Sequence, residues 1–188
     1  LMDSFQSMLC RDCWRRQPGA LIICKPANIR AFRDGFGRSL FAKRSFPDVT
    51  IRWEQIAIDA HACVLARSLV FEKMLQSSMT EGSTRVIQVD DFAADVVEGF
   101  LELLFTGTRT STESWGDMLR MADKYQVDGV IKICLASMLS TLSVETVVPY
   151  FGALNKLSHL EDVKSAKEEV WSKVESNKEL LRKLADAA

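Results

Sequence analysis

The residues best suited to chemistry in this sequence are two histidines, five cysteines and several paired carboxylates. A nucleophilic triad needs a histidine base beside a nucleophile. His61 ends a predicted strand near Asp59 among small apolar residues, which favours a structural histidine bonded to nearby backbone over a catalytic one. His159 stands at a predicted helix start and is expected to be exposed. Neither histidine supports a triad.

The cysteines offer an incomplete zinc motif. Cys10 and Cys13 have the two-residue gap of zinc ligands, and Cys24 is a third candidate, but no second pair or nearby histidine completes four ligands. Cys63 and Cys134 lie inside apolar segments, where cysteine behaves as a small hydrophobe. An odd cysteine count favours a reducing compartment, the cytoplasm or the nucleus. We expect no metal and no cofactor.

The paired carboxylates also give little support to catalysis. Asp90 with Asp91, and Glu168 with Glu169, suit helix caps and solvated faces better than acid–base work. The glycines from Gly35 to Gly37 are too few for a phosphate-binding loop. The sequence therefore predicts a protein that is not an enzyme.

Composition and charge favour a single globular domain with additions. The chain has 188 residues, of which 47% are hydrophobic and 26% charged. No apolar run reaches 18 residues and no signal peptide opens the chain, so we expect no membrane association. Residues 1–47 carry nine basic and three acidic side chains, and residues 48–188 carry fifteen and twenty-two. The acidic main part makes nucleic acid an unlikely partner, and the basic arm is either a solvated tail or a contact for an acidic partner.

Three strands and a series of helices would have to position any site. Residues 48–53 and 55–61 predict a hairpin that turns at Glu54 and Gln55, and residues 85–89 predict a third strand. Helical periods follow in 62–76, with a break at Arg67 and Ser68, and in the stretch that ends at Gly107. Leu21 to Cys24 is a weakly supported strand.

Capping residues place the remaining helix starts. Asp90 and Asp91 are expected to cap the long helix, and Ser114 and Ser158 each open a predicted capping box. Ser143 is expected to cap a helix that runs toward Leu157 and is kinked or shortened at Pro149. One last charged helix is expected to reach about Leu184.

These elements predict an α+β fold, in which helices cover a small sheet of short strands. The predicted organisation has three parts: a basic, poorly patterned arm over 1–35, a main domain over 36–140, and a helical extension over 141–188.

Several motifs fall in order within residues 46–140: FPDVTI, AIDAHACVLARSLVFEKML, RVIQVDDF, FLELLFTGT and LRMADKYQVDGVIKIC. Their order and spacing resemble the BTB/POZ fold, and within that family the speckle-type adaptors that combine a MATH domain with a BTB domain. The helices after Leu142 resemble the short extension that follows the BTB domain in such adaptors. No segment ahead of residue 46 resembles a MATH domain.

Two positions depart from the family pattern. Ala62 stands where a Lys or Arg often follows the histidine, and Leu69 stands where Pro is frequent. The basic residue helps to form a charged pocket in BTB transcription factors. Its replacement by Ala62 argues against a corepressor-binding groove of that type.

The resemblance implies that the chain forms homodimers. In BTB domains the helix before the first strand often packs across the dimer interface, and residues 37–46 are the matching segment here, with Leu40 and Phe41 as the expected contacts. Their burial would contribute a few kcal/mol at roughly 25 cal/mol per Å² of apolar area. Packing of both side chains against their own domain is an equally open alternative.

The resemblance also implies binding to cullin-3, the scaffold of a ubiquitin ligase that would act on an unknown substrate. Cullin-binding adaptors carry a hydrophobic–any–Glu motif in the loop before the third strand, and Met79-Thr80-Glu81 stands there in the predicted loop 76–84. Met is a flexible apolar side chain suited to a partner's groove. Met79, Glu81 and Tyr125 are therefore the candidate cullin contacts, although Met79 folded back on its own core and Tyr125 packed in the core are alternatives. A further alternative is a BTB self-association scaffold, or a transcription-linked oligomerisation module, that does not bind cullin.

Overall fold

The structure, a computed structural model, describes residues 26–78, 80–109 and 114–187. The cysteines at 10, 13 and 24, the expected strand Leu21 to Cys24 and Met79 lie outside the described residues. Helix α2 spans Pro26–Lys43 and begins inside the arm that the sequence predicted to be poorly patterned. The helix expected over 37–46 is therefore longer at its start and ends at Lys43. Pro26 suits a first helical position because proline lacks the N–H that would have no partner there.

The sheet has three strands in the described residues, in the order β2-β1-β3. Strands β1 (Val49–Trp53) and β2 (Ile56–Ala60) form the predicted antiparallel hairpin, and Glu54 in its turn adopts a φ of 47°. Strand β3 (Val86–Gln88) pairs with β1 in parallel. Ile58 and Ala60 enter the core as expected, whereas Ile56 is 48% exposed because it begins the strand at the rim of the core.

Three short helices connect β2 to β3. Helices α3 (Ala62–Leu65) and α4 (Leu69–Gln76) confirm the predicted break near Ser68. The prediction of a loop over 76–84 was wrong in its second half, because Thr80–Thr84 form helix α5. The connection is therefore structured where the sequence pattern indicated a polar linker.

Helix α6 (Ala94–Thr106) is largely buried and contributes much of the core. It ends as predicted at Gly107, whose φ of 71° lies in the left-handed region that glycine tolerates best. Its start is later than predicted, because the N-cap position is Ala93 rather than Asp90 or Asp91. The two aspartates precede the helix in an irregular segment.

Helices α7 (Trp115–Lys124) and α8 (Asp128–Ser140) form an antiparallel pair beside α6. The capping box expected at Ser114 does not form within the described residues. Ser114 has a φ of 63°, and its hydroxyl donates a hydrogen bond to Asp95 at 3.3 Å instead.

The C-terminal helices are α9 (Val147–Lys156), α10 (Glu161–Glu175) and α11 (Lys178–Ala185). The N-cap position of α9 is Thr146 rather than Ser143, so the helix is shorter than the one expected from Ser143. Pro149 lies in its first turn, where the missing N–H of proline removes no helical hydrogen bond. Leu160 rather than Ser158 is the N-cap position of α10. The single last helix was also wrong, because Asn177 caps a separate α11 by accepting hydrogen bonds from the amides of Glu179 and Leu180.

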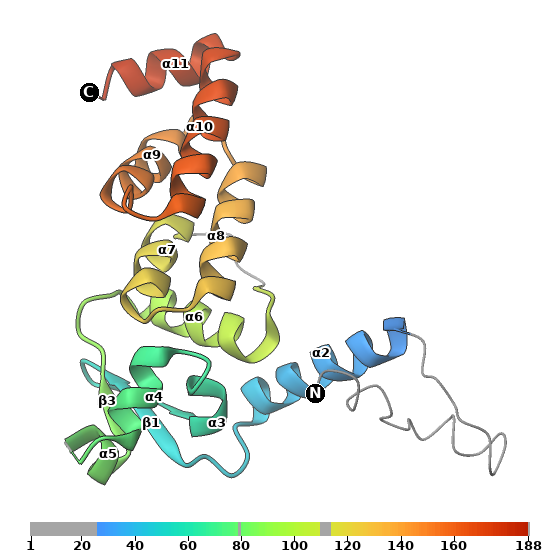
Figure 1. Cartoon of the computed structure of the whole chain (residues 1–188), viewed down its shortest axis with the longest axis vertical. Coiled ribbons are helices and arrows are strands. Elements are labelled where there is room, and N and C mark those ends of the chain that lie inside the picture. The colour runs from blue at the N-terminus through green and yellow to red at the C-terminus, as the bar shows by residue number, and fades with distance from the viewer. Residues whose placement is uncertain (1–25, 79, 110–113, 188) are drawn as a thin grey trace, which may run out of the picture.

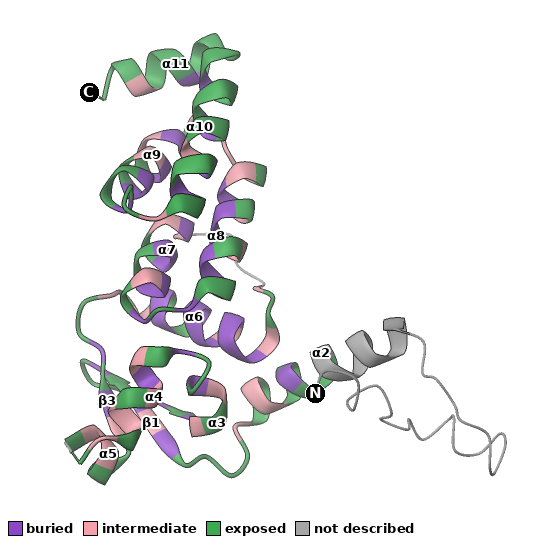
Figure 2. Cartoon of the chain, in the orientation of Figure 1, coloured by how far each residue is buried: buried purple, intermediate pink, exposed green. Residues whose placement is uncertain are grey.

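The prediction of an α+β fold is confirmed. Figure 1 shows the sheet with α3, α4 and α5 at one end of the molecule, α6 beyond it, and α7 to α11 stacked along the long axis, while α2 projects to one side. One hydrophobic core runs from Val49 in β1 to Leu180 in α11, and buried residues concentrate on the faces where these elements meet (Figure 2). No helix in the described part of the chain is both long and apolar enough to cross a membrane.

Candidate partner-binding surface

Helix α4 is fixed at its start by one buried hydroxyl. Ser68 accepts a hydrogen bond from the amide of Phe71 at 3.1 Å and donates one to the carbonyl of Tyr125 at 2.5 Å. The first bond caps α4 and the second ties it to the end of α7. These two bonds therefore fix the orientation of α4, the helix that precedes α5, relative to the core.

An aromatic cluster lies beneath α4. The Tyr125 ring lies 4.3 Å from that of Phe71 and 5.9 Å from that of Phe100, measured between centroids, and only 2% of the residue is exposed. Burial, together with the nearby charges of Asp91 and Asp90, raises the pKa of Tyr125 to about 12. The buried ring favours the core-packing alternative for Tyr125 and leaves little of it for direct contact with a partner.

Helix α5 packs against the end of α4 at a close backbone contact. A Cβ atom on Gly82 would stand 1.9 Å from the carbonyl oxygen of Ser77, so a side chain does not fit there without displacing the backbone. Glu81 lies in the first turn of α5 and is half-buried. This position favours a carboxylate, since free amides at a helix start attract negative charge. The glycine requirement is a feature that the sequence analysis did not name, although a glycine in a short polar stretch was its signal.

A single residue connects α5 to the sheet. The amide of Arg85 donates to the carbonyl of Glu81 at 3.0 Å, and the carbonyl of Arg85 accepts from the amide of Thr50 at 2.9 Å. Arg85 has a φ of 58°, which turns the chain from the helix into β3. The surface of α5 is therefore held directly by the central strand.

Charged and aromatic side chains connect the segment before α6 to α7. Lys124 forms an ion pair with Asp91, and its ammonium lies 5.8 Å from the ring centroid of Phe92. The guanidinium of Arg120 lies 5.9 Å from the same ring. Phe92 is half-buried between these cations, which links the segment before α6 to one face of α7.

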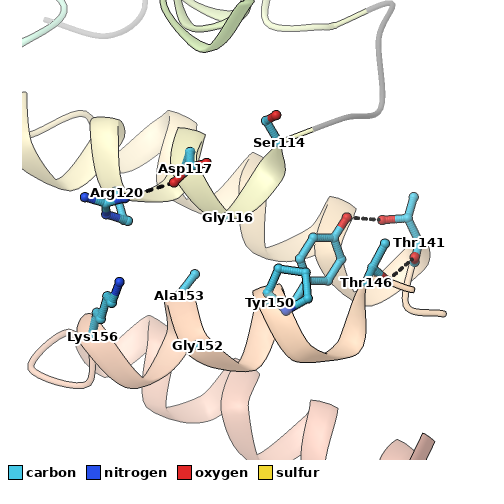
Figure 3. Close-up of a pocket in the computed structure, with 11 residues that line it drawn as sticks. Ser114, Gly116, Asp117, Arg120, Thr141, Thr146, Tyr150, Gly152, Ala153 and Lys156 are labelled. Atoms are coloured by element: carbon cyan, nitrogen blue, oxygen red, sulfur yellow. Dashed lines mark hydrogen bonds and ion pairs between the residues drawn. The ribbon is translucent and has the colours of Figure 1, made fainter. Parts of the chain in front are cut away.

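A cavity of about 690 Å³ opens between α7 and α9, and Arg120 is among the residues that line it (Figure 3). Arg120 forms an ion pair with Asp117 at 2.9 Å, and Lys156 lies at the same end of the cavity. At the other end the hydroxyls of Tyr150 and Thr141 share a hydrogen bond of 3.0 Å. The cavity therefore has cationic side chains at one end and hydroxyl groups at the other.

The predicted dimer contacts lie where α2 meets α6. Leu40 and Phe41 are half-buried, and the Phe41 ring lies 5.6 Å from the ring of Phe105. A Cβ atom on Gly37 would lie 2.3 Å from the carbonyl oxygen of Phe105, so the two helices approach closely. Both predicted residues therefore pack at least partly within their own chain, and a further contact across a dimer stays a prediction.

Two aromatic residues beside them are exposed and were missed from the sequence. Phe36 on α2 is 58% exposed, and Phe46 in the segment after α2 is 93% exposed. Aromatic side chains are enriched at protein interfaces, which makes both residues candidates for a contact between chains. Hydrophobic periodicity did not reveal them, because Phe36 lies outside the helix that was expected.

The candidate catalytic residues have structural roles. The Nε2 atom of His61 donates a hydrogen bond to the carbonyl of Ser45 at 2.7 Å, which holds the segment between α2 and β1, as the structural interpretation expected. The carboxylate of Asp48 accepts from the amide of Ala62 at 2.7 Å and so supports the start of α3. Cys63 is exposed, contrary to the expectation of a buried thiol, whereas Cys134 is buried. Within the described ranges, no group of three or more His, Cys, Asp or Glu side chains is arranged to hold a metal.

Comparisons with known proteins identify the family. The sequence model of the BTB/POZ domain matches residues 38–142, more than half of the chain. The chain belongs to the BTB/POZ family. It is 32% identical over 115 residues to BTB and MATH domain-containing protein 42 of Caenorhabditis elegans, which covers 58% of this chain and 28% of that protein. It is 30% identical over 147 residues to BTB/POZ domain-containing protein At4g08455 of Arabidopsis thaliana, covering 74% and 59%.

A solved structure supports the fold assignment. The BTB domain of zebrafish PATZ1 superimposes with a TM-score of 0.50 at 17% identity, covering 65% of this chain and all of that domain. A BTB/POZ domain is a protein-interaction and self-association module and is generally not an enzyme. The chain spans 28% and 59% of the length of the two curated relatives, so the partners of the complete protein are matters for proposal.

Proposed function

We propose that this BTB/POZ chain is a homodimeric adaptor that recruits cullin-3 to a substrate for ubiquitination. The observation that carries the proposal is the α4–α5 junction. Gly82 against Ser77 places a short ordered helix before β3, with Glu81 in its first turn. This is the position at which cullin-binding relatives carry their hydrophobic–any–Glu motif. Met79, the hydrophobic member of that motif, lies outside the described residues and enters from the sequence alone.

The neighbouring surface supports a large partner. The segment before α6, the exposed face of α7 and the cavity beside α9 follow one another through Phe92 and Arg120. A partner large enough to extend from α5 onto this path would meet charged side chains there, which favours a specific orientation. Tyr125 acts in the proposal as a buried support for α4 rather than as a contact residue.

Titration of the purified chain against the N-terminal domain of cullin-3 tests the proposal. We expect Met79→Glu to abolish binding, because a charge would replace the apolar side chain, and Glu81→Lys to weaken it about tenfold or more, in the range measured for charged interface residues. Glu175→Lys at the end of α10 is the matched control and should leave binding unchanged. The oligomeric state of each variant is measured in parallel.

The alternative function is a self-association scaffold that does not bind cullin, and the exposed Phe36 and Phe46 favour self-association under either function. If the unmodified chain forms dimers but does not bind cullin-3, the scaffold function is supported and the adaptor proposal is overturned. We further place the protein in the cytoplasm or nucleus, since Cys63 and Cys134 are both free thiols and suit a reducing compartment.

A further inference from the structure

The turn between α9 and α10 carries a serine that the fold does not use. The sequence predicted that Ser158 would cap α10, but the N-cap position is Leu160, whose side chain makes no capping hydrogen bond. Ser158 is exposed, and its hydroxyl has no hydrogen-bond partner among the residues that the structure describes. This hydroxyl is therefore a nucleophile that is accessible from solvent and has no structural role in the described part of the chain.

Two accessible carboxylates follow this hydroxyl. Glu161 and Asp162 stand three and four residues after Ser158, and both are exposed in the first turn of α10. The Glu161 carboxylate pairs with Lys164 at 2.6 Å, yet 84% of the Glu161 side chain is exposed. An exposed ion pair contributes little to stability, so it opens readily when another protein binds. The turn therefore presents a serine and two negative charges to an enzyme with a basic substrate groove.

The same spacing occurs elsewhere in the chain, and the structure distinguishes its members. Seven serines in the described residues stand three positions before an acidic residue: Ser45, Ser78, Ser114, Ser158, Ser165, Ser172 and Ser176. A second acidic residue follows at the fourth position only for Ser158 and Ser165. Ser165 lies inside α10, where helical hydrogen bonds prevent the backbone from extending along the groove of an enzyme. Of these seven serines, Ser158 alone combines two following acids with a position in a turn.

The first turn of α10 is free to adjust to such an enzyme. The first amides of a helix have no partner within the helix, and the Leu160 side chain caps none of them. Helix ends of this kind open at little cost in free energy. Val163 is fully buried and holds α10 in place from the end of this turn onward. Residues 158–162 are therefore able to extend without disturbing the core.

We propose that Ser158 is a phosphorylation site for an acidophilic serine kinase that recognises Glu161 and Asp162. The Oγ atom of Ser158 attacks the γ-phosphorus of a nucleoside triphosphate, and a new O–P bond forms. The bond from that phosphorus to the bridging oxygen breaks, the hydroxyl proton passes to a carboxylate base of the kinase, and the nucleoside diphosphate leaves. This site is distinct from α5 and does not depend on cullin binding.

The phosphate would change the charge of this face of the C-terminal helices. Lys164 and Lys167 line a cavity together with Ser158 and Glu168, and Lys164 is paired with Glu161. Carboxylates therefore balance the nearby cations, and the selection of Ser158 comes from the acids that the kinase reads. A phosphoserine adds a charge of about −1.5 to −2 at neutral pH. Modification makes this face distinctly acidic, which favours a basic partner and disfavours an acidic one.

Incubation of the folded full chain with a purified kinase of the casein kinase 2 class and magnesium ATP tests the proposal. Intact mass spectrometry and fragment mapping should find one phosphate per chain, on Ser158. Ser158→Ala should take up none, and Ser165→Ala, the matched control, should behave as the unmodified chain. No uptake, phosphate on a different residue, or uptake only by the urea-unfolded chain would overturn the proposal.

Charge variants test the recognition of the two acids. Glu161→Gln combined with Asp162→Asn should lower the initial rate of phosphorylation about tenfold or more, because the charge contacts with the kinase are removed. Glu168→Gln combined with Glu169→Gln makes the matched change after Ser165 and should leave the rate unchanged. A full rate for the first variant would show that these carboxylates do not select Ser158, and the proposal would fail.

Discussion

At the residue scale, Tyr125 shows how a predicted contact residue becomes a structural one. Its carbonyl accepts the Ser68 hydroxyl, and its ring packs between those of Phe71 and Phe100. The resemblance to cullin adaptors placed Tyr125 near a partner, and a hydrophobic period assigns such a residue equally well to the core. Helical periodicity predicts the helix face on which a residue lies, but it does not predict how far the side chain is buried.

The raised pKa of Tyr125 predicts a stability change at high pH. Below pH 10 both folded and unfolded chains keep the phenol proton, so this group adds no pH dependence. Between pH 10 and about 12 the unfolded chain loses that proton while the folded chain retains it, so stability falls by up to about 1.4 kcal/mol per pH unit. Urea unfolding across this range should show a shallower decline for Tyr125→Phe than for the unmodified chain. Identical slopes would refute the assignment.

At the scale of elements, the strands and the features set by local backbone preference followed the sequence closely, and several helix starts did not. The hairpin, the break at Ser68 and the Gly107 terminus depend on local backbone preferences that the sequence states directly. Asp90 and Ser114 are good capping residues by type, yet Asp90 accepts from Gln88 at 2.6 Å and Ser114 donates to Asp95. A local hydrogen bond engages Asp90 and a tertiary one engages Ser114, so neither side chain caps a helix.

Helix α5 is the element that the sequence could not predict. Thr80–Thr84 reads TEGST, and glycine and threonine are weak helix formers. The middle of the helix packs closely against the Ser77 backbone at the end of α4, and Arg85 joins its last turn to the sheet. Contacts with neighbouring segments, rather than helix propensity, therefore stabilise α5. A local sequence pattern does not predict such contacts.

Gly82→Ala tests this account of α5. The new methyl group would meet the Ser77 carbonyl at 1.9 Å, so we expect a loss of about 1–3 kcal/mol in the free energy of unfolding, as for other overpacked sites. Gly129→Ala is the matched control, since nothing lies within 4 Å of its added Cβ atom in α8, and should be neutral or stabilising by up to about 1 kcal/mol. Chemical denaturation of both variants provides the comparison. Equal stabilities would show that α5 tolerates displacement.

At the scale of the whole molecule, α2 is the element that extends furthest from the body (Figure 1). Its last turns are fixed to α6 by Gly37 and Phe41, and an exposed aromatic residue stands on the same helix at Phe36. The sequence located this helix and its two apolar residues. The sequence alone could not tell whether Leu40 and Phe41 pack within their own chain or against another chain. Both environments favour the same apolar residue types.

Two phenylalanine substitutions separate these roles. Phe41→Ala should lower the melting temperature and cost about 1–3 kcal/mol, because the ring packs on Phe105 in the same chain. Phe36→Glu should weaken self-association, since 58% of the residue is exposed. Thermal unfolding and sedimentation velocity measure the two effects. A Phe36→Glu chain that sediments as the unmodified chain would exclude this side chain from the interface.

The bond pattern of Arg85 has a mechanical consequence. One residue ends α5 and pairs with the central strand, so no flexible linker separates them. A rotation or pull applied to α5 passes to β1 and, through the shared core, to α6 and α2. A partner bound to α5 would therefore have a fixed orientation relative to a partner bound to α2. The domain would set the geometry between the two bound proteins.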